Sequence, residues 1–154
     1  MYTPLLIVCI LSIIAATFGV MYGFGLIGLA SLTRSDLESA LEATGFGSDS
    51  QMLDQMFTLV DLGPWFIVFN IIEIVGVVLL MRMLWPGFHI YAASQIGLAG
   101  LMVIAVGFAG ALVSIMWNAA WVLIYFNLFR RAEVYANQNN GNQGDDSLPT
   151  NPNN

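Results

Sequence analysis

The sequence contains no lysine, and its only basic side chains are four arginines among 154 residues. Without lysine the chain cannot form a retinal Schiff base or use an amine nucleophile, so that covalent chemistry is excluded. The formal net charge of −6 offers no basic surface to phosphates, which argues against nucleic acid as a partner. Charged residues make up only 9% of the chain, against about 25% in soluble domains.

Residues that bind metals or carry redox chemistry are also scarce. Cys9 is the only cysteine, so no disulfide can form within the chain. His89 is the only histidine, which excludes a bis-histidine haem site, and we expect it to anchor the chain at the membrane interface. The sequence has no glycine-rich phosphate loop, HExxH, CxxC or catalytic-triad pattern. We therefore predict no metal, no cofactor and no enzymatic activity.

Hydrophobic residues dominate instead, at 58% of the chain, which is more than a soluble domain of this size could bury. About 20 apolar helical residues cross the ~30 Å hydrocarbon core of a bilayer. The sequence predicts four such spans, at residues 4–32, 64–84, 88–107 and 109–129. The predicted fold class is therefore all-α, an integral membrane four-helix bundle.

Two of these predicted spans have an alternative. A signal peptide is the alternative for the first, but residues 1–3 carry no basic side chain and the apolar run is long, which favours a retained span. Residues 88–129 are apolar almost throughout, and one helix of that length would measure about 63 Å, twice the hydrocarbon thickness. The chain must therefore turn back, and we predict the turn at residues 107–110, Gly-Phe-Ala-Gly.

The segments outside the spans are polar. Residues 33–62 carry six carboxylates against Arg34, and two capping boxes, Ser35-x-x-Glu38 and Ser48-x-x-Gln51, indicate helix starts. Apolar positions of the second helix form one stripe: Met52, Leu53, Met56, Phe57 and Val60. We predict a helical hairpin over the membrane surface, with a solvated, partly helical loop as the alternative. Residues 133–154 are rich in Asn, Gln, Gly and Asp and are predicted to be a disordered tail.

The arginines predict the orientation. With four spans, Arg82, Arg130 and Arg131 lie on one side of the membrane and the acidic segment 33–62 lies on the other. The positive-inside rule then places both termini in the cytoplasm and the hairpin outside. The predicted location is the cytoplasmic (inner) membrane, as a multi-pass protein.

Polar residues inside the spans form the candidate site. Glu73 lies about 13–14 Å below Pro64, and Asn70 shares its helix face. The same counting places Gln95 and Asn118 inside the membrane on the third and fourth spans. The predicted intramembrane cluster consists of Glu73, Asn70, Gln95 and Asn118, closed by Thr17 or Ser94.

Glu73 has two interpretations, and the sequence leaves both open. It can tie the helices together through hydrogen bonds of about 0.6–2 kcal/mol each. It can also bind a proton or cation, since no intramembrane Arg or Lys pairs with it. Gly19 and Gly23 likewise form a GxxxG spacing that fits either a specific dimer seam or the general abundance of glycine in membrane helices.

Several motifs together resemble a known group. They are Leu-Ile-Val-Cys-Ile-Leu-Ser at 6–12, Leu-Met-Arg at 80–82, Trp-Pro-Gly-Phe-His-Ile-Tyr at 85–91, Gln-Ile at 95–96 and Leu-Ile-Tyr-Phe-Asn-Leu at 123–128. The pattern is similar to that of small uncharacterised four-transmembrane-helix bacterial membrane proteins. In those, a Lys-x-Gly-Phe-x-x-Tyr turn precedes the third span, and Leu-Tyr-x-Val-Asn-Leu-Lys closes the fourth. Trp85, Pro86 and Arg130 stand here where lysines are usual. The resemblance implies four helices and a bacterial membrane, and it implies no mechanism.

These observations predict a non-catalytic integral membrane protein, an accessory or scaffold subunit acting through its helix faces and outer hairpin. The alternative is a small proton- or cation-coupled transporter or channel centred on Glu73. The expected partners are the lipid bilayer and either another membrane protein or further copies of the chain.

Overall fold

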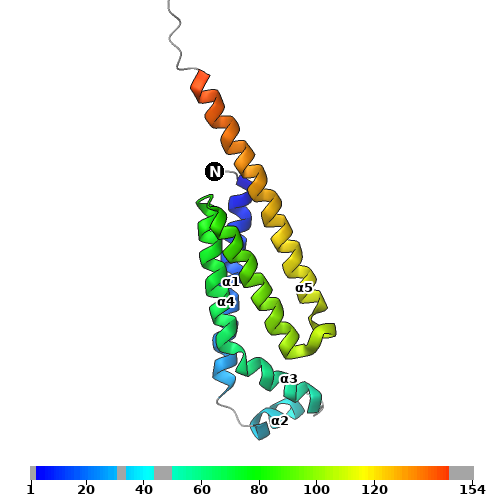
Figure 1. Ribbon diagram of the computed structural model, residues 1–154. Helices are drawn as coiled ribbons and strands as arrows, with labels where there is room; N and C mark the ends of the chain where they lie inside the picture. The colour runs from blue at the N-terminus through cyan, green and yellow to red at the C-terminus, as the bar shows by residue number, and fades with distance from the viewer. Residues whose placement is uncertain (1–2, 31–33, 44–49, 146–154) are drawn as a thin grey trace, which may run out of the picture.

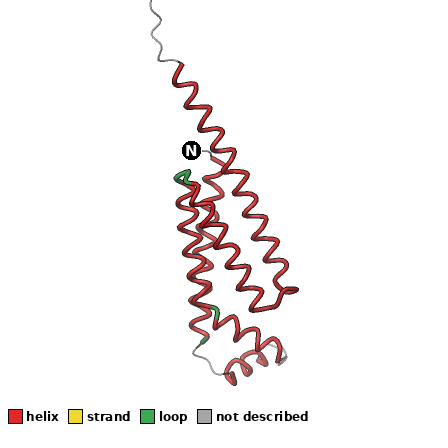
Figure 2. The backbone as a smooth tube through the Cα atoms, in the orientation of Figure 1, coloured by secondary structure: helices red, strands yellow, loops and turns green. Residues whose placement is uncertain are grey.

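The computed structural model describes residues 3–30, 34–43 and 50–145. Apart from short turns at residues 30, 62 and 82–84, the chain is helical in these ranges and forms no strand there, so the fold is the all-α bundle that the sequence predicts (Figures 1 and 2). The helices are α1 (Thr3–Leu29), α2 (Arg34–Ala43), α3 (Ser50–Asp61), α4 (Gly63–Met81) and α5 (Trp85–Asp145). Three of them, α1, α4 and α5, are long and apolar enough to cross a membrane.

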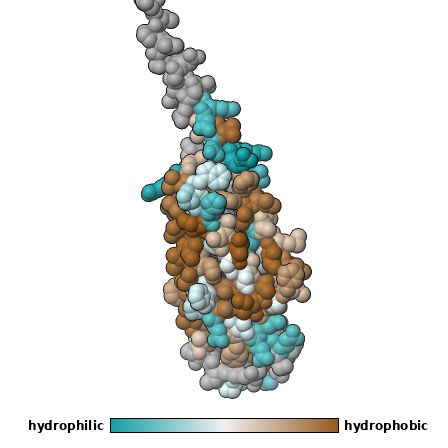
Figure 3. Space-filling model, viewed as in Figure 1, coloured by the Kyte–Doolittle hydropathy of each residue, from teal (hydrophilic) through white to brown (hydrophobic). Residues whose placement is uncertain are grey.

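Helix α1 runs antiparallel to α4 (Figure 1). It buries one stripe at helical spacing: Leu5, Cys9, Ser12, Ala16, Gly23 and Leu26. Its bulkier apolar side chains, such as Ile7, Phe18 and Phe24, are exposed. Figure 3 shows the same pattern over one face of the molecule, where a broad hydrophobic belt lies between polar ends. A surface of this kind is stable in lipid, where apolar side chains need no further cover.

Helix α5 is divided at Gly107, whose backbone has φ 75° and ψ 168°. This conformation is far from helical and essentially restricted to glycine. The two legs, residues 85–106 and 108–145, double back on each other (Figure 1). Rings at the far end pack together, with the centroids of Trp85 and Phe129 4.9 Å apart. The break lies within the predicted turn at 107–110.

The described parts of the hairpin segment are the helices α2 and α3, and α3 packs across one end of the bundle (Figure 1). Leu53 and Val60 are buried, so this part of the predicted apolar stripe faces the bundle. Val60 joins an apolar cluster with Leu26, Phe66 and Leu101. Within residues 34–43 and 50–61 the structure therefore agrees with the predicted helices and not with a partly helical loop. The capping side chains of Glu38 and Ser48 fall outside the described side chains.

The predicted disordered tail is wrong for residues 133–145, which continue α5 as helix beyond the rest of the bundle (Figure 1). Helix formation costs most at nucleation, and here the preceding span has already supplied the nucleus. No proline occurs in residues 133–145 to interrupt the helix. Polar composition alone did not account for this continuation. Residues 146–154 lie outside the described part of the chain.

Candidate functional site

A pocket of about 220 Å³ lies between α1, α4 and both legs of α5. Four of the five residues in the predicted cluster line it, namely Asn70, Glu73, Gln95 and Asn118. Its other lining residues are Leu11, Ser12, Ala15, Ala16, Tyr91, Leu98, Trp117 and Trp121. Residues far apart in the sequence thus form one polar layer in the middle of an apolar bundle.

Hydrogen bonds hold this polar layer in place. Asn70, Glu73 and Gln95 are only 6%, 7% and 5% exposed. The Asn70 amide donates to the carbonyl of Phe66, one turn earlier, at 2.7 Å. The side chain of Gln95 is a hydrogen-bond partner of the Glu73 carboxyl. Asn118 donates to the Gln95 backbone carbonyl at 3.4 Å and so links the two legs of α5.

The prediction that Thr17 closes the cluster is wrong. Its side chain is exposed, and its hydroxyl donates to the Ile13 carbonyl on its own helix at 2.7 Å. Ser94, the alternative, is fully buried but donates to the Tyr91 carbonyl and does not line the pocket. The hydroxyl residue of α1 that lines the pocket is Ser12. Counting residues gives the depth of Thr17 but not its direction around the helix, and five residues from Ser12 correspond to about 140° of rotation.

Gly19 and Gly23 pack within the chain. A Cβ atom added at Gly19 would overlap the side chain of Asn70. One added at Gly23 would lie 2.6 Å from Cγ1 of Ile67 and 3.0 Å from the carbonyl oxygen of Gly63. The two glycines therefore let α1 approach α4 closely, as small residues do in lipid. Both glycines therefore have a packing role within the chain, and Gly19 also lines a hollow in the side of the bundle.

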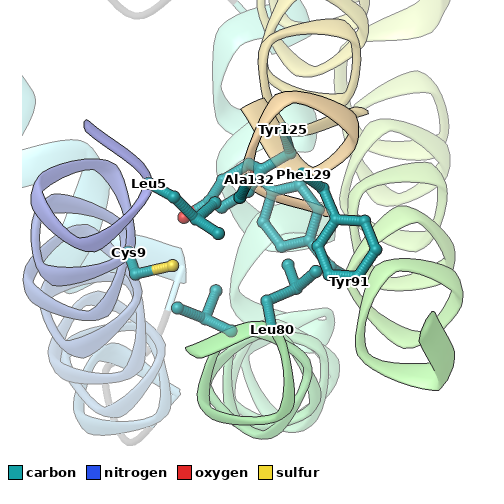
Figure 4. Packing of buried hydrophobic residues seen from close by; sticks show 8 residues of the cluster. Leu5, Cys9, Leu80, Tyr91, Tyr125, Phe129 and Ala132 are labelled. Carbon is teal, nitrogen blue, oxygen red and sulfur yellow. The ribbon is translucent and has the colours of Figure 1, made fainter. Parts of the chain in front are cut away.

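Apolar clusters close the pocket toward both ends of the bundle. Tyr91, which lines the pocket, also belongs to the larger cluster near the N-terminal end of α1 (Figure 4). That cluster consists of Leu5, Cys9, Val77, Leu80, Tyr91, Tyr125, Phe129 and Ala132. The cluster of Leu26, Val60, Phe66 and Leu101 lies toward the hairpin. Among the described side chains, the polar layer therefore lies between two apolar clusters along the bundle axis.

The pocket opens through the side of the bundle. Leu11 and Trp117, two of its lining residues, are 52% and 64% exposed within the hydrophobic belt. A second hollow of about 400 Å³ shares Asn70, Leu98 and Asn118 with the first. It is also lined by residues that continue toward the hairpin: Phe18, Gly19, Tyr22, Phe66, Met102 and Ser114. We call the two together the flank groove.

The flank groove exists because α1 and the second leg of α5 diverge. They are joined near the N-terminal end of α1, where the Tyr125 hydroxyl donates to the Val8 carbonyl at 3.1 Å. From there the two helices separate toward the hairpin (Figure 1). Their separation leaves α4 and the first leg of α5, with Glu73 and Gln95, as the floor of the groove.

The polar side chains of the site are one carboxyl group, three amides, the hydroxyls of Ser12 and Tyr91 and two tryptophan indoles. Among the described residues, no group of three His, Cys, Asp or Glu side chains could hold a metal ion. His89 does not line the pocket, and its ring lies beside those of Trp85 and Phe88. Such a site can accept and donate hydrogen bonds and can bind a cation.

The Trp-Pro-Gly-Phe-His-Ile-Tyr motif has a packing role at the joint of α4 and α5. A Cβ at Gly87 would lie 2.6 Å from the backbone nitrogen of Leu80, and one at Gly76 would lie 2.7 Å from that of Tyr91. Both glycines therefore permit close contact between the two helices.

No protein-family model, curated protein or solved structure matches this chain. The resemblance to small bacterial four-span proteins stays a prediction.

Proposed function

We propose that this chain is a non-catalytic membrane protein of four spans that serves as an accessory subunit and holds a membrane partner along the flank groove. One observation carries the proposal: the polar pocket around Glu73 opens sideways, through the hydrophobic belt. Polar groups that face lipid are costly, because the hydrocarbon offers them no hydrogen bonds. A partner that covers the groove removes that cost.

The four spans are supported by the lengths of the helices. The first leg of α5, residues 85–106, would measure about 33 Å, and the second is longer, so each can cross the hydrocarbon core. Arg82, Arg130 and Arg131 lie toward the end where Trp85 meets Phe129, opposite the acidic hairpin. By the positive-inside rule we assign this end to the cytoplasm, with both termini inside. The bacterial inner membrane follows from the sequence resemblance.

A binding role is favoured over conduction by the two apolar clusters that close the pocket along the axis. A pore requires a polar or wide path across the membrane. The alternative function, a small proton- or cation-coupled transporter or channel, is favoured by one observation, the buried carboxyl of Glu73 beside an open pocket. Such a transporter would have to move α1 and the second leg of α5 relative to each other.

Site-specific photocrosslinking tests the proposal. We expect a photoreactive residue at Leu11, in the groove, to give one product of fixed mass in native membranes. Ile71 on α4 is the matched control, because its exposure of 49% is close to the 52% of Leu11 and it does not line the groove. The partner in the Leu11 product is identified by mass spectrometry, and its yield is expected to fall in Glu73→Gln.

Two results would contradict the accessory role. Equal products from Leu11 and Ile71 would mean that the groove is not a preferred contact surface. Unchanged crosslinking in Glu73→Gln, together with loss of a proton-coupled flux in proteoliposomes, would favour the transporter instead. Glu73→Gln retains the volume of the side chain and one carbonyl acceptor, so it tests the acid and not the packing.

A further inference from the structure

The pocket around Glu73 is rich in hydrogen-bond acceptors. Asn70 and Asn118 each commit an amide N–H to a backbone carbonyl, that of Phe66 and that of Gln95 respectively. Each keeps its second amide N–H and its amide oxygen, and that of Asn70 lies against Gly19. The Gln95 side chain is paired with the carboxyl of Glu73, which adds oxygen atoms of its own. The carboxyl of Glu73 and the amide oxygens can therefore accept hydrogen bonds from a ligand that donates several.

The mouth of the pocket suits a positive charge. Trp117 and Trp121 both line it, and their rings meet edge to face with centroids 5.9 Å apart and planes at 75°. Tyr91 lines the inner side. Aromatic faces attract cations through their quadrupoles, and the attraction is stronger where water is excluded. Among the described residues that line the pocket, none is basic, so the chain supplies no counter-ion to Glu73 there.

The depth of the site restricts the source of such a cation. Glu73 lies ten residues into α4, or about 15 Å along the helix, near the middle of a bilayer. A lipid headgroup stays at the interface, because burying its phosphate at this depth is costly. A second copy of this chain has no lysine to offer. A lysine side chain on a helix that crosses the membrane can reach the pocket directly from the side.

From this juxtaposition of Glu73, three amides and two tryptophans in a pocket open to lipid, we propose that the site binds the primary ammonium group of a lysine in a partner's transmembrane helix. This inference rests on the proposed function and names the chemical group that the flank groove recognises. The ammonium donates to the Glu73 carboxyl and to amide oxygens of the pocket, and its alkyl stem passes between Leu11 and Trp117. Hydrogen bonds between charged groups are the strongest that side chains offer.

The test uses the full chain in phosphatidylcholine vesicles with a Leu/Ala-rich transmembrane peptide that carries one central lysine. Energy transfer reports association between a dye at Asn137→Cys, in a Cys9→Ala background, and a dye on the peptide. The matched peptide has norleucine, which keeps the stem of lysine and removes the charge. We expect the lysine peptide to bind at least about tenfold more tightly than the norleucine peptide. Glu73→Gln should abolish this preference, and Asp61→Asn, an exposed acid at the hairpin, should retain it.

A second variant guards against loss of folding in Glu73→Gln. Trp117 is mostly exposed, so Trp117→Leu leaves the core intact and should reduce the lysine preference severalfold with an unchanged helical circular dichroism spectrum. Equal binding of the two peptides, or a lysine preference that survives Glu73→Gln, would overturn the inference. Competition by dodecylammonium as strong as by the lysine peptide would make a free lipophilic amine the occupant and would also overturn it. In each case crosslinking from Leu11 would still test the accessory role by itself.

Discussion

Tyr125 shows how a single hydroxyl shapes the candidate site. Its side chain is fully buried among apolar residues, and its hydroxyl donates to the carbonyl of Val8. This contact joins the second leg of α5 to α1 at the closed end of the flank groove. In a membrane such bonds average about 0.6 kcal/mol and reach about 1.7 kcal/mol. The joint therefore depends on packing as well as on the hydrogen bond.

We expect Tyr125→Phe to lower the free energy of unfolding by about 0.5–1.5 kcal/mol, because the hydrogen bond is lost and the ring is kept. The measurement is unfolding of the purified chain from mild detergent into dodecyl sulfate, followed by circular dichroism. Tyr22→Phe is the matched control, since Tyr22 is half exposed, and its change should stay within about 0.5 kcal/mol. Equal effects of the two substitutions would contradict a structural role for the Tyr125 hydroxyl.

At the scale of elements, the break in α5 decides the architecture. A continuous helix from residue 85 to residue 145 would be about 90 Å long and would not fold back on the bundle. Gly107 provides the reversal through a backbone conformation that side chains disfavour. Because the reversal brings Gln95 close to Asn118, the second half of the polar pocket depends on it.

Gly107→Ala should therefore destabilise the chain by about 1–3 kcal/mol, through backbone strain alone. Apart from Gly107 itself and its neighbours in the chain, no heavy atom lies within 4 Å of a Cβ added at Gly107. A steric clash therefore does not contribute. Gly100 has equally open space but lies within the first leg of α5. Gly100→Ala should be neutral or stabilising by up to about 1 kcal/mol, because alanine favours helix. Thermal unfolding in detergent measures the change in stability for both substitutions. A destabilising Gly100→Ala with a neutral Gly107→Ala would contradict the assignment of the helix reversal to Gly107.

At the scale of the whole molecule, charge and hydropathy divide the protein into a belt and two ends. The belt exposes large apolar side chains on every long helix, among them Ile14, Val75, Ile96 and Val113. Arg82, Arg130 and Arg131 mark one end, the acidic hairpin with Arg34 forms the other, and the flank groove places polar groups within the belt. An orientation in the membrane follows from this polarity and is open to direct measurement.

Cysteine labelling from outside the cell tests this orientation. In a Cys9→Ala background, we expect Ser39→Cys, exposed on α2, to react with a membrane-impermeant maleimide on intact cells. Asn137→Cys, exposed on the extension of α5, should react only after the cells are permeabilised. The wild-type Cys9 is fully buried and serves as the unlabelled control. Labelling of Asn137→Cys on intact cells would reverse the proposed orientation.

The amino-acid sequence by itself determined the features that depend on one residue or one run at a time. Hydropathy and length predicted the helical spans, capping and periodicity predicted the hairpin helices, and a glycine-containing segment predicted the turn at Gly107. Counting along each helix placed Glu73, Gln95 and Asn118 at compatible depths. These properties follow from the contact of each segment with lipid or water and need no neighbour to be known.

Only the tertiary structure decided which face of each helix meets which neighbour. In the structure, Ser12 lines the pocket and Thr17 does not, and Gly19 packs against Asn70 of the same chain. It also opened the flank groove on one side and extended α5 through residues 133–145. Rotation about a helix axis and propagation of a helix are set by pairwise packing and by preceding turns, which composition and residue counting do not contain.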